Sequence, residues 1–286
     1  MSIPENPWNP RRVLRWSLPA LVLLALLFWG ALRLLFTPSV EGDWIPEQAR
    51  LAEIRFEEDG VWIGGIRDFL WESRTSFTEG YTERFVADED VREVDLVVEP
   101  FSSFKGAAHV FLSFGLADGE RVAFSVEARR EEGQSWGVLR GLLRQYPLVV
   151  IIGTERDLIG LRANHRQNDV YVYPVEATRK QVLALFHQML RRADTLTREP
   201  EFYHTLFNNC AGNITREVNE LFPGRIPFHT TLFFPEKLDR YARELGLLAV
   251  EEEFPEMREA HRINEAAAHA AHSDAFTRMI REREMN

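Results

Sequence analysis

The one cysteine of this 286-residue chain, Cys210, lies in the segment Phe207-Asn-Asn-Cys-Ala-Gly-Asn213. Apolar residues follow it at helical spacing as far as Leu221, so a helix is predicted to begin at Cys210, with Asn208 or Asn209 as its N-cap. At a helix start, unpaired N–H groups and the positive end of the helix dipole lower the pKa of a thiol. Cys210 is therefore a candidate nucleophile. The alternative is a small buried residue that packs in the core.

A candidate base comes from a predicted hairpin. A three-residue loop with Gly119 in the left-handed conformation aligns the apolar faces of its two strands. The aligned pairs are Phe114 with Val122, Leu112 with Phe124, and Val110 with Val126. This register puts His109 opposite Glu127, with Cβ atoms roughly 5 Å apart. A carboxylate beside an imidazole fixes its tautomer and favours its protonated form. An ordinary His–Glu surface pair is the alternative.

Together these residues are the parts of a Cys–His acyl-transfer site. Cys210 would be the nucleophile, His109 the general base, and Glu127 the residue that orients the histidine. Backbone N–H groups around Cys210 would supply part of an oxyanion hole. Three further residues are candidates for oxyanion or substrate contacts: Asn209, Tyr203 and Arg162.

Other polar residues suggest roles that have simpler alternatives. Arg129, Arg156 and Arg162 can contact a lipid phosphate, although such arginines more often pair with neighbouring acids. The three histidines of residues 261–272 lack the cysteine or acid cluster that would complete a metal site. We therefore expect neither a metal nor another cofactor.

Strands and helices must hold the site residues in place. Strands are predicted over residues 61–69, 81–86, 94–98, 108–116, 121–127, 148–152 and 170–174. A helix with a capping box should begin at Thr178, and a short helix is expected over residues 47–55. This pattern predicts an α+β fold in which helices pack on an antiparallel sheet.

An apolar segment near the N-terminus, residues 11–36, predicts one membrane span. Arg11, Arg12 and Arg15 precede an uncharged run from Trp16 to Leu32. Its length is sufficient, at about 1.5 Å per residue, for much of the ~30 Å hydrocarbon core. Basic residues before the span and acidic residues after it place the N-terminus in the cytoplasm. A cleaved signal peptide is the alternative.

The chain therefore divides into four predicted segments. They are the cytoplasmic N-terminus and anchor (1–36), a linker (37–60), a catalytic domain (61–250), and a charged tail that is helical or flexible (251–286). The formal net charge is −10. An acidic domain argues against nucleic acid as a partner.

Four motifs in series carry a resemblance to a known family. They are His109-Val-Phe-Leu-Ser-Phe-Gly, Ser125-Val-Glu-Ala-Arg-Arg, Thr154-Glu-Arg-Asp-Leu-Ile-Gly-Leu-Arg162 and Pro200-Glu-Phe-Tyr-His-Thr-Leu-Phe-Asn-Asn-Cys210. From about residue 44 to residue 248 the chain resembles the Lnb N-terminal periplasmic domain family. The order of its histidine and cysteine also resembles the circularly permuted NlpC/P60 papain-like fold.

This resemblance implies lipoprotein maturation, in which an acyl chain is transferred onto the N-terminal cysteine of bacterial lipoproteins. It implies Cys210 as nucleophile, through a thioester, and His109 as general base, with membrane lipid or lipoprotein as substrate. With the predicted span, it implies a single-pass protein of the inner (cytoplasmic) membrane whose main domain lies in the periplasm. The acyl donor and acceptor stay open, as does the choice between transfer and hydrolysis. The alternatives are a cysteine amidase or peptidase on cell-wall peptide and a non-catalytic envelope protein.

Overall fold

The computed structural model describes residues 10–35, 37–101 and 105–282, and the chain separates into two compact units, Met1–Ser39 and Val40–Asn286. The first unit contains helix α1 (Pro10–Leu35). Among the described residues, we find no helix that combines the length and apolar character needed to cross a membrane. The span predicted over residues 11–36 therefore stays a prediction. Residues 1–9 and Phe36, which belong to the predicted N-terminus and anchor, lie outside the described residues.

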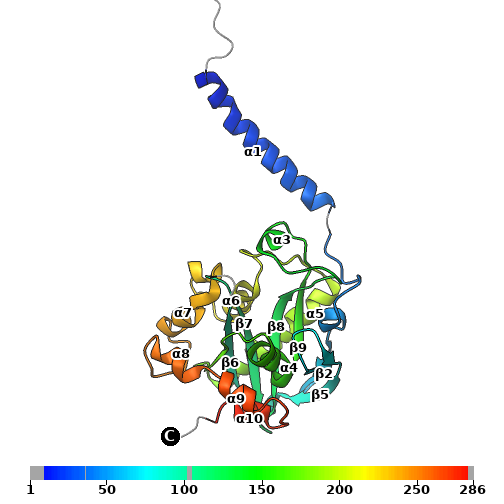
Figure 1. Ribbon diagram of the computed structural model, residues 1–286, viewed down its shortest axis with the longest axis vertical. Coiled ribbons are helices and arrows are strands. Elements are labelled where there is room, and N and C mark those ends of the chain that lie inside the picture. The colour runs from blue at the N-terminus through cyan, green and yellow to red at the C-terminus, as the bar shows by residue number, and fades with distance from the viewer. Residues whose placement is uncertain (1–9, 36, 102–104, 283–286) are drawn as a thin grey trace, which may run out of the picture. The chain divides into compact units, whose positions relative to one another are not determined.

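The second unit is built on a mixed sheet of eight described strands in the order β1-β2-β9-β8-β7-β6-β10, with β5 also paired to β2 (Figure 1). The strands are β1 (Glu53–Phe56), β2 (Gly60–Arg67), β5 (Tyr81–Ala87), β6 (Val91–Pro100), β7 (Ala108–Leu116), β8 (Arg121–Ala128), β9 (Leu148–Gly153) and β10 (Tyr171–Pro174). All neighbours are antiparallel except β2 and β9, which meet in parallel at Arg67 and Gly153. A small ribbon of β3 (Leu70–Trp71) and β4 (Phe77–Thr78) stands apart from this sheet.

Helices cover both faces of the sheet, so the core has two layers. On one face lie α5 (Arg179–Arg198), α6 (Cys210–Leu221) and α7 (Leu238–Glu244), whose apolar side chains join the larger buried cluster. On the other face lie α4 (Glu155–Gly160), α9 (Asn264–His269) and α10 (Phe276–Met279), which contribute to a second cluster. The other described α-helices of this unit are α2 (Pro46–Ala49), α3 (Val138–Leu142) and α8 (Glu256–His261). This arrangement confirms the predicted α+β class.

The hairpin of β7 and β8 has the predicted register. Leu112 pairs with Phe124 and Phe114 pairs with Val122. Gly119 has φ +86° in the connecting loop, the left-handed conformation that the three-residue turn requires. Apolar burial on one face thus selects the pairing, because a shift of one residue would move every side chain to the other face.

The structure corrects one local prediction and narrows another. The helix expected over residues 47–55 is only α2, because the chain turns at Arg50 and enters strand β1 at Glu53. The segment from residue 251, expected to be helical or flexible, forms α8, α9 and α10. Phe276 and Ile280 of this segment are buried in the second cluster, so it is an integral part of the folded unit.

Candidate active site

Cys210 is the first residue of α6, as predicted, and Asn209 is the N-cap. The Asn209 side chain accepts a hydrogen bond from the N–H of Gly212 at 2.7 Å, which satisfies one of the unpaired donors of the helix start. This cap leaves the N–H groups of Cys210 and Ala211 directed at the thiol. The N–H of Val110 in β7 also points to the thiol, so Cys210 is buried against the strand that carries His109.

The pKa of Cys210 is raised to about 11, opposite to the predicted direction. Burial is the main cause, because a thiolate loses its hydration there, and the negative charge of Glu127 adds to the effect. The N–H groups of Val110, Ala211 and Cys210 lower the pKa but do not compensate. The sequence identified these donors correctly. The extent to which the thiol is buried could not be predicted from the sequence.

His109 and Glu127 share a face, as predicted, but a third residue joins them. His109 Nε2 lies 2.7 Å from Ser125 Oγ, and Ser125 Oγ donates to Glu127 Oε1 at 2.8 Å. The serine has a single proton and gives it to the carboxylate, so it must accept from the imidazole. The ring proton is therefore on Nε2, and the lone pair is on Nδ1. Ser125 is fully buried, which isolates this chain from water.

Glu127 is fixed by cationic and amide groups from distant segments. Arg162 Nη2 donates to its Oε1 at 2.9 Å, and Gln48 Nε2 donates to its Oε2 at 2.7 Å. Burial alone would raise the pKa of Glu127, but the positive charges of Arg162 and Arg67 and the hydrogen bond from Gln48 lower it well below the usual range. Glu127 is therefore an anion that accepts hydrogen bonds from Ser125, Arg162 and Gln48.

His109 is neutral in this environment. Its pKa is lowered to about 3, chiefly by burial and then by the positive charge of Arg162, while Glu127 acts in the opposite direction. The ring stacks on Phe111, with centroids 5.6 Å apart, and Phe111 belongs to the second cluster of the core. Cys210 belongs to the first cluster.

The thiol and the imidazole therefore approach β7 from opposite faces of the sheet. His109 and Val110, the residue whose N–H points to the thiol, are consecutive in β7 and lie beyond the last paired residues of the hairpin, Leu112 and Phe124. Within the described part of the chain, no hydrogen bond joins Cys210 to His109. The negative charge of Glu127 nevertheless raises the pKa of the thiol, and His109 is linked to Glu127 through Ser125.

The other predicted contact residues have structural partners. Both N–H groups of the Asn209 amide are used, by the carbonyls of Thr205 at 2.9 Å and Leu232 at 3.0 Å, so this amide has no donor left for an oxyanion. Tyr203 is buried near the thiol, and its pKa is raised by burial and then by Cys210. Tyr203 thus lies near the thiol of Cys210.

Arg162 lies beneath the site and is 2 % exposed. Its guanidinium donates to the carbonyl of Leu158 at 2.7 Å and to Glu127, and it lies 2.9 Å from Glu99 Oε2. It stands over the ring of Phe111 at 5.0 Å. A lipid phosphate cannot reach a guanidinium that is enclosed in this way, so Arg162 is a positioning residue for Glu127.

The remaining arginine candidates also have protein partners. Arg129 donates to the carbonyls of Val40, Gln48 and Ala49, and burial lowers its pKa to about 10. Arg156 pairs with Asp68 at 3.0 Å. Over the described ranges, the histidines, cysteine and acids form no group that could hold a metal ion.

Sequence reasoning did not assign a role to Ser125, Gln48 and Glu99. Ser125 could have been found, because it alternates with Glu127 on the predicted face of β8. Glu99 of β6 lies opposite His109 of β7. This register could not be predicted, because the sequence between the two strands shows no tight turn that would determine it. Gln48 lies in the segment 47–55, for which the sequence predicts a helix, and no sequence signal connects this segment to Glu127.

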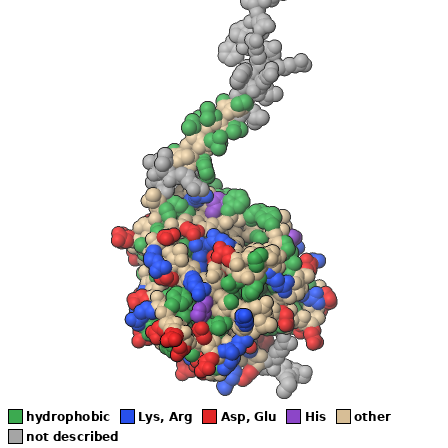
Figure 2. Space-filling model, turned by 180° about the vertical axis from the view of Figure 1, so that it is seen from behind, with side chains coloured by type: hydrophobic (Ala, Val, Ile, Leu, Met, Phe, Trp, Pro, Cys, Tyr) green, Lys and Arg blue, Asp and Glu red, His purple; other side chains and the backbone are tan. Residues whose placement is uncertain are grey.

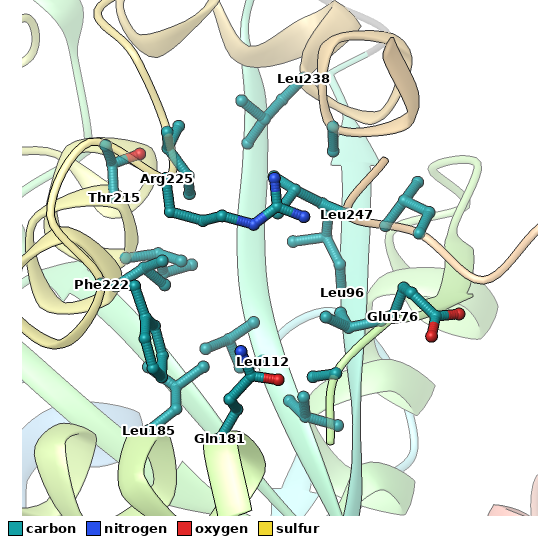
Figure 3. A pocket seen from close by; sticks show the side chains of 18 of the residues that line it. Leu96, Leu112, Glu176, Gln181, Leu185, Thr215, Phe222, Arg225, Leu238 and Leu247 are labelled. Carbon is teal, nitrogen blue, oxygen red and sulfur yellow. The ribbon is translucent and has the colours of Figure 1, made fainter. Parts of the chain in front are cut away.

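An apolar cavity of about 160 Å³ lies beside the start of α6, between α5, α6, α7 and the sheet (Figure 3). Its lining includes Ala211, the residue after Cys210, and Leu112 of β7. Figure 3 shows the side chain of Arg225 extending across the cavity toward Leu247. The Arg225 guanidinium donates to the carbonyls of Leu245 at 3.0 Å and Gly246 at 2.9 Å, which ties the chain after α6 to the chain after α7.

Comparison with known families agrees with the motifs. Residues 77–233, more than half of the chain, match the Lnb N-terminal periplasmic domain. The chain belongs to this family. It is thus a periplasmic envelope protein, and the match includes His109, Glu127 and Cys210. No curated protein and no solved structure matches the chain. The permuted NlpC/P60 topology stays a prediction.

Proposed function

We propose that this Lnb-family protein is a thiol acyltransferase or acyl hydrolase, which forms a thioester between Cys210 and an acyl group of a lipoprotein or phospholipid. The apolar cavity beside α6 carries this proposal. Its lining begins one residue after Cys210, so an acyl chain held there would have its carbonyl close to the thiol. A peptide substrate would instead require a polar cleft with hydrogen-bonding groups along its walls.

The volume of the cavity limits how much of a chain it accepts. An apolar protein cavity of about 150 Å³ holds one benzene molecule, on the order of six carbon atoms. The cavity of about 160 Å³ would therefore accept the first part of an acyl chain. A longer chain would have to pass Arg225, whose two hydrogen bonds to Leu245 and Gly246 cross the cavity. Because Arg225 is exposed, this path leads to solvent.

The chemistry would begin from a neutral thiol and a neutral imidazole. Sγ of Cys210 attacks the acyl carbonyl while its proton passes to Nδ1 of His109, the ring atom with the free lone pair. This step requires Nδ1 to come within hydrogen-bond reach of Sγ when the substrate binds. The imidazolium then formed has Ser125 Oγ at Nε2, and Ser125 in turn donates to the anion of Glu127, whose negative charge stabilises the imidazolium. The N–H groups at the start of α6 would bind the oxyanion.

The tetrahedral intermediate then collapses and releases the alcohol or amine of the acyl donor. This leaving group takes the proton from His109, and the acyl group remains on Cys210 as a thioester. An amine acceptor that attacks the thioester completes acyl transfer, whereas water completes hydrolysis. The thiol is regenerated in both cases, so no other reactant is needed.

The test is to detect the acyl-enzyme. The purified full chain is mixed with phospholipid and a diacylated lipopeptide, and intact-protein mass spectrometry follows the mass of the chain. We expect an added acyl group that hydroxylamine removes, and its loss in Cys210→Ala. Absence of the adduct, together with cleavage of a peptidoglycan peptide, would favour the amidase alternative. Absence of both would favour a non-catalytic envelope protein.

The proposal includes the N-terminal anchor at the inner membrane. In α1, the described residues from Leu21 to Trp29 include large apolar side chains that are more than half exposed. Such side chains need a non-aqueous cover. Extraction of membranes with alkaline carbonate should leave the full chain in the pellet and release the fragment 40–286. Release of the full chain would contradict the anchor.

A further inference from the structure

Large apolar side chains are exposed around the loops that lead into α6. We name this group the aromatic rim and define it as Trp136, Leu139, Phe207, Phe228 and Phe234. Their exposed fractions are 37 %, 67 %, 72 %, 74 % and 54 %. Figure 2 shows apolar side chains gathered at the upper edge of the globular unit, whereas charged side chains cover much of the remaining face. Soluble proteins rarely expose so many aromatic side chains together without a function.

Contacts between the loops show that the rim is one surface. Thr205 Oγ1 donates to the carbonyl of Val138 at 2.9 Å, which joins the loop before α6 to α3. The rings of Phe207 and Phe228 lie 5.7 Å and 5.3 Å from the ring of Phe233, which therefore links them. Residues far apart in the sequence thus form a continuous apolar edge.

This surface surrounds the segment that enters the active site. Asn209, the cap of α6, donates to the carbonyls of Thr205 and Leu232, and so connects two rim loops directly to the residue before Cys210. Phe207 precedes Cys210 by three residues. Whatever covers the rim would therefore lie next to the entrance of the thiol site.

The charges around the rim are mainly basic, although the whole chain is acidic. Arg140 and Lys237 lie exposed within the rim segments 136–144 and 228–237, and Glu236 is the single acidic residue of these two segments. The segment 200–209 before α6, which carries Phe207, contains one further acid, Glu201, and Arg192 pairs with it at 2.5 Å. Lys105, also exposed, precedes Gly106, whose backbone lies against Phe234. The formal net charge of the chain is −10, so this basic border is a local feature.

We propose that the aromatic rim is the surface by which the folded unit docks on a bilayer that contains anionic phospholipid. Phe, Trp and Leu side chains on adjacent loops enter the boundary between head groups and acyl chains, and flanking Lys and Arg attract anionic head groups. The exposed basic side chains beside the apolar ones favour an anionic bilayer over a protein partner. The proposal extends the proposed function, but it does not depend on acyl chemistry at Cys210.

The experiment uses the fragment 40–286, which forms its own compact unit with both core clusters. It also carries Cys210→Ala, so that turnover cannot affect the result. Co-sedimentation is measured with vesicles of phosphatidylcholine alone and with an equal mixture of phosphatidylcholine and phosphatidylglycerol. We expect binding to the mixture, weaker binding to the neutral vesicles, and loss of binding to the mixture at high salt.

The test variant changes three rim residues, Phe207→Ser, Phe228→Ser and Phe234→Ser. The control changes three other exposed apolar residues: Phe56→Ser, Leu70→Ser and Phe85→Ser, which are 42 %, 48 % and 47 % exposed. We expect the rim variant to bind at least about tenfold more weakly and the control to bind as the parent does. Equal binding by the rim variant, or equal loss in both variants, would overturn the proposal.

A second measurement covers the case in which the rim variant does not fold. Brominated phosphatidylcholine quenches tryptophans that enter the acyl region, so the parent should show quenching that Trp136→Phe removes while vesicle binding is kept. Unchanged quenching would place the contact elsewhere. Binding to a soluble lipopeptide but not to vesicles would assign the rim to a peptide and also overturn the proposal.

Discussion

At the scale of single residues, the site is a compromise between burial and reactivity. The start of α6 supplies N–H groups that favour a thiolate, yet burial outweighs them and keeps Cys210 protonated. His109 is likewise neutral, because burial and Arg162 disfavour its cation more than Glu127 favours it. The resting pair is therefore thiol and imidazole, and charge separation would occur only as the substrate reacts.

This balance predicts how Cys210 responds to pH. Because its pKa is raised to about 11, the thiolate fraction at neutral pH is small and grows about tenfold per pH unit until that value is reached. Alkylation of the folded chain by iodoacetamide, followed by mass spectrometry, should increase in the same way. At pH 7 it should be slower than alkylation of the urea-denatured chain. Faster labelling of the folded chain would show that the N–H groups at the helix start lower the pKa of Cys210 more than burial raises it.

Ser125 is the residue on which the orientation of His109 depends. Ser125→Ala removes the acceptor of Nε2–H and the donor to Glu127, so the imidazole can rotate and the Nδ1 lone pair is no longer fixed. We expect acyl-enzyme formation to slow by roughly tenfold or more, since a hydrogen bond to a charged group contributes about 1.5–3 kcal/mol. The measurement is the rate of adduct formation by mass spectrometry.

The matched control for this variant is Ser113→Ala. Ser113 is equally buried in β7, but it donates to Glu155 at 2.6 Å and does not contact His109. Both variants should lose similar stability in thermal unfolding, and only Ser125→Ala should lose activity. An equal loss of activity in the two variants would show that Ser125 supports the fold and does not orient His109.

At the scale of elements, the cavity between α5, α6 and α7 should set the length of the acyl group. Val218→Phe adds a ring to its wall, where Val218 of α6 is only partly buried. We expect acylation by long chains to fall by at least about tenfold, with little change for an acetyl donor and no loss of thermal stability. The acetyl donor is the internal control. Equal inhibition with both donors would mean that the cavity does not hold the chain.

Local patterns predicted the elements well where one physical signal dominated. Alternating apolar residues and Gly119 fixed the hairpin, and the Thr178–Gln181 capping box is present at the start of α5. Local patterns carry less information about groups whose environment comes from distant segments. The pKa of Cys210 depends on burial by the whole fold, and Gln48 reaches Glu127 from 79 residues away.

At the scale of the whole molecule, the C-terminal segment completes the sheet's second face. Arg281, just after α10, donates to Asp95 Oδ2 at 2.7 Å and to Glu155 Oε2 at 2.7 Å. Glu155 is fully buried and Asp95 nearly so. A buried carboxylate without a cation is costly. The last residues of the described chain therefore neutralise acids that lie beneath the central strands.

Arg281→Ala should consequently destabilise the fragment 40–286 by roughly 2–4 kcal/mol in urea unfolding at neutral pH, with Arg121 still 2.8 Å from Asp95 to limit the loss. Arg278→Ala is the control. It removes an exposed pair with Glu282 and should change stability by less than about 1 kcal/mol. Burial by itself raises the pKa of Glu155 and Arg281 is the largest opposing charge, so we expect Arg281→Ala to raise this pKa and protonation to remove the cost of the buried charge. The stability deficit should therefore shrink as the pH falls through that raised pKa. A deficit that is independent of pH would instead indicate lost packing rather than lost charge pairing.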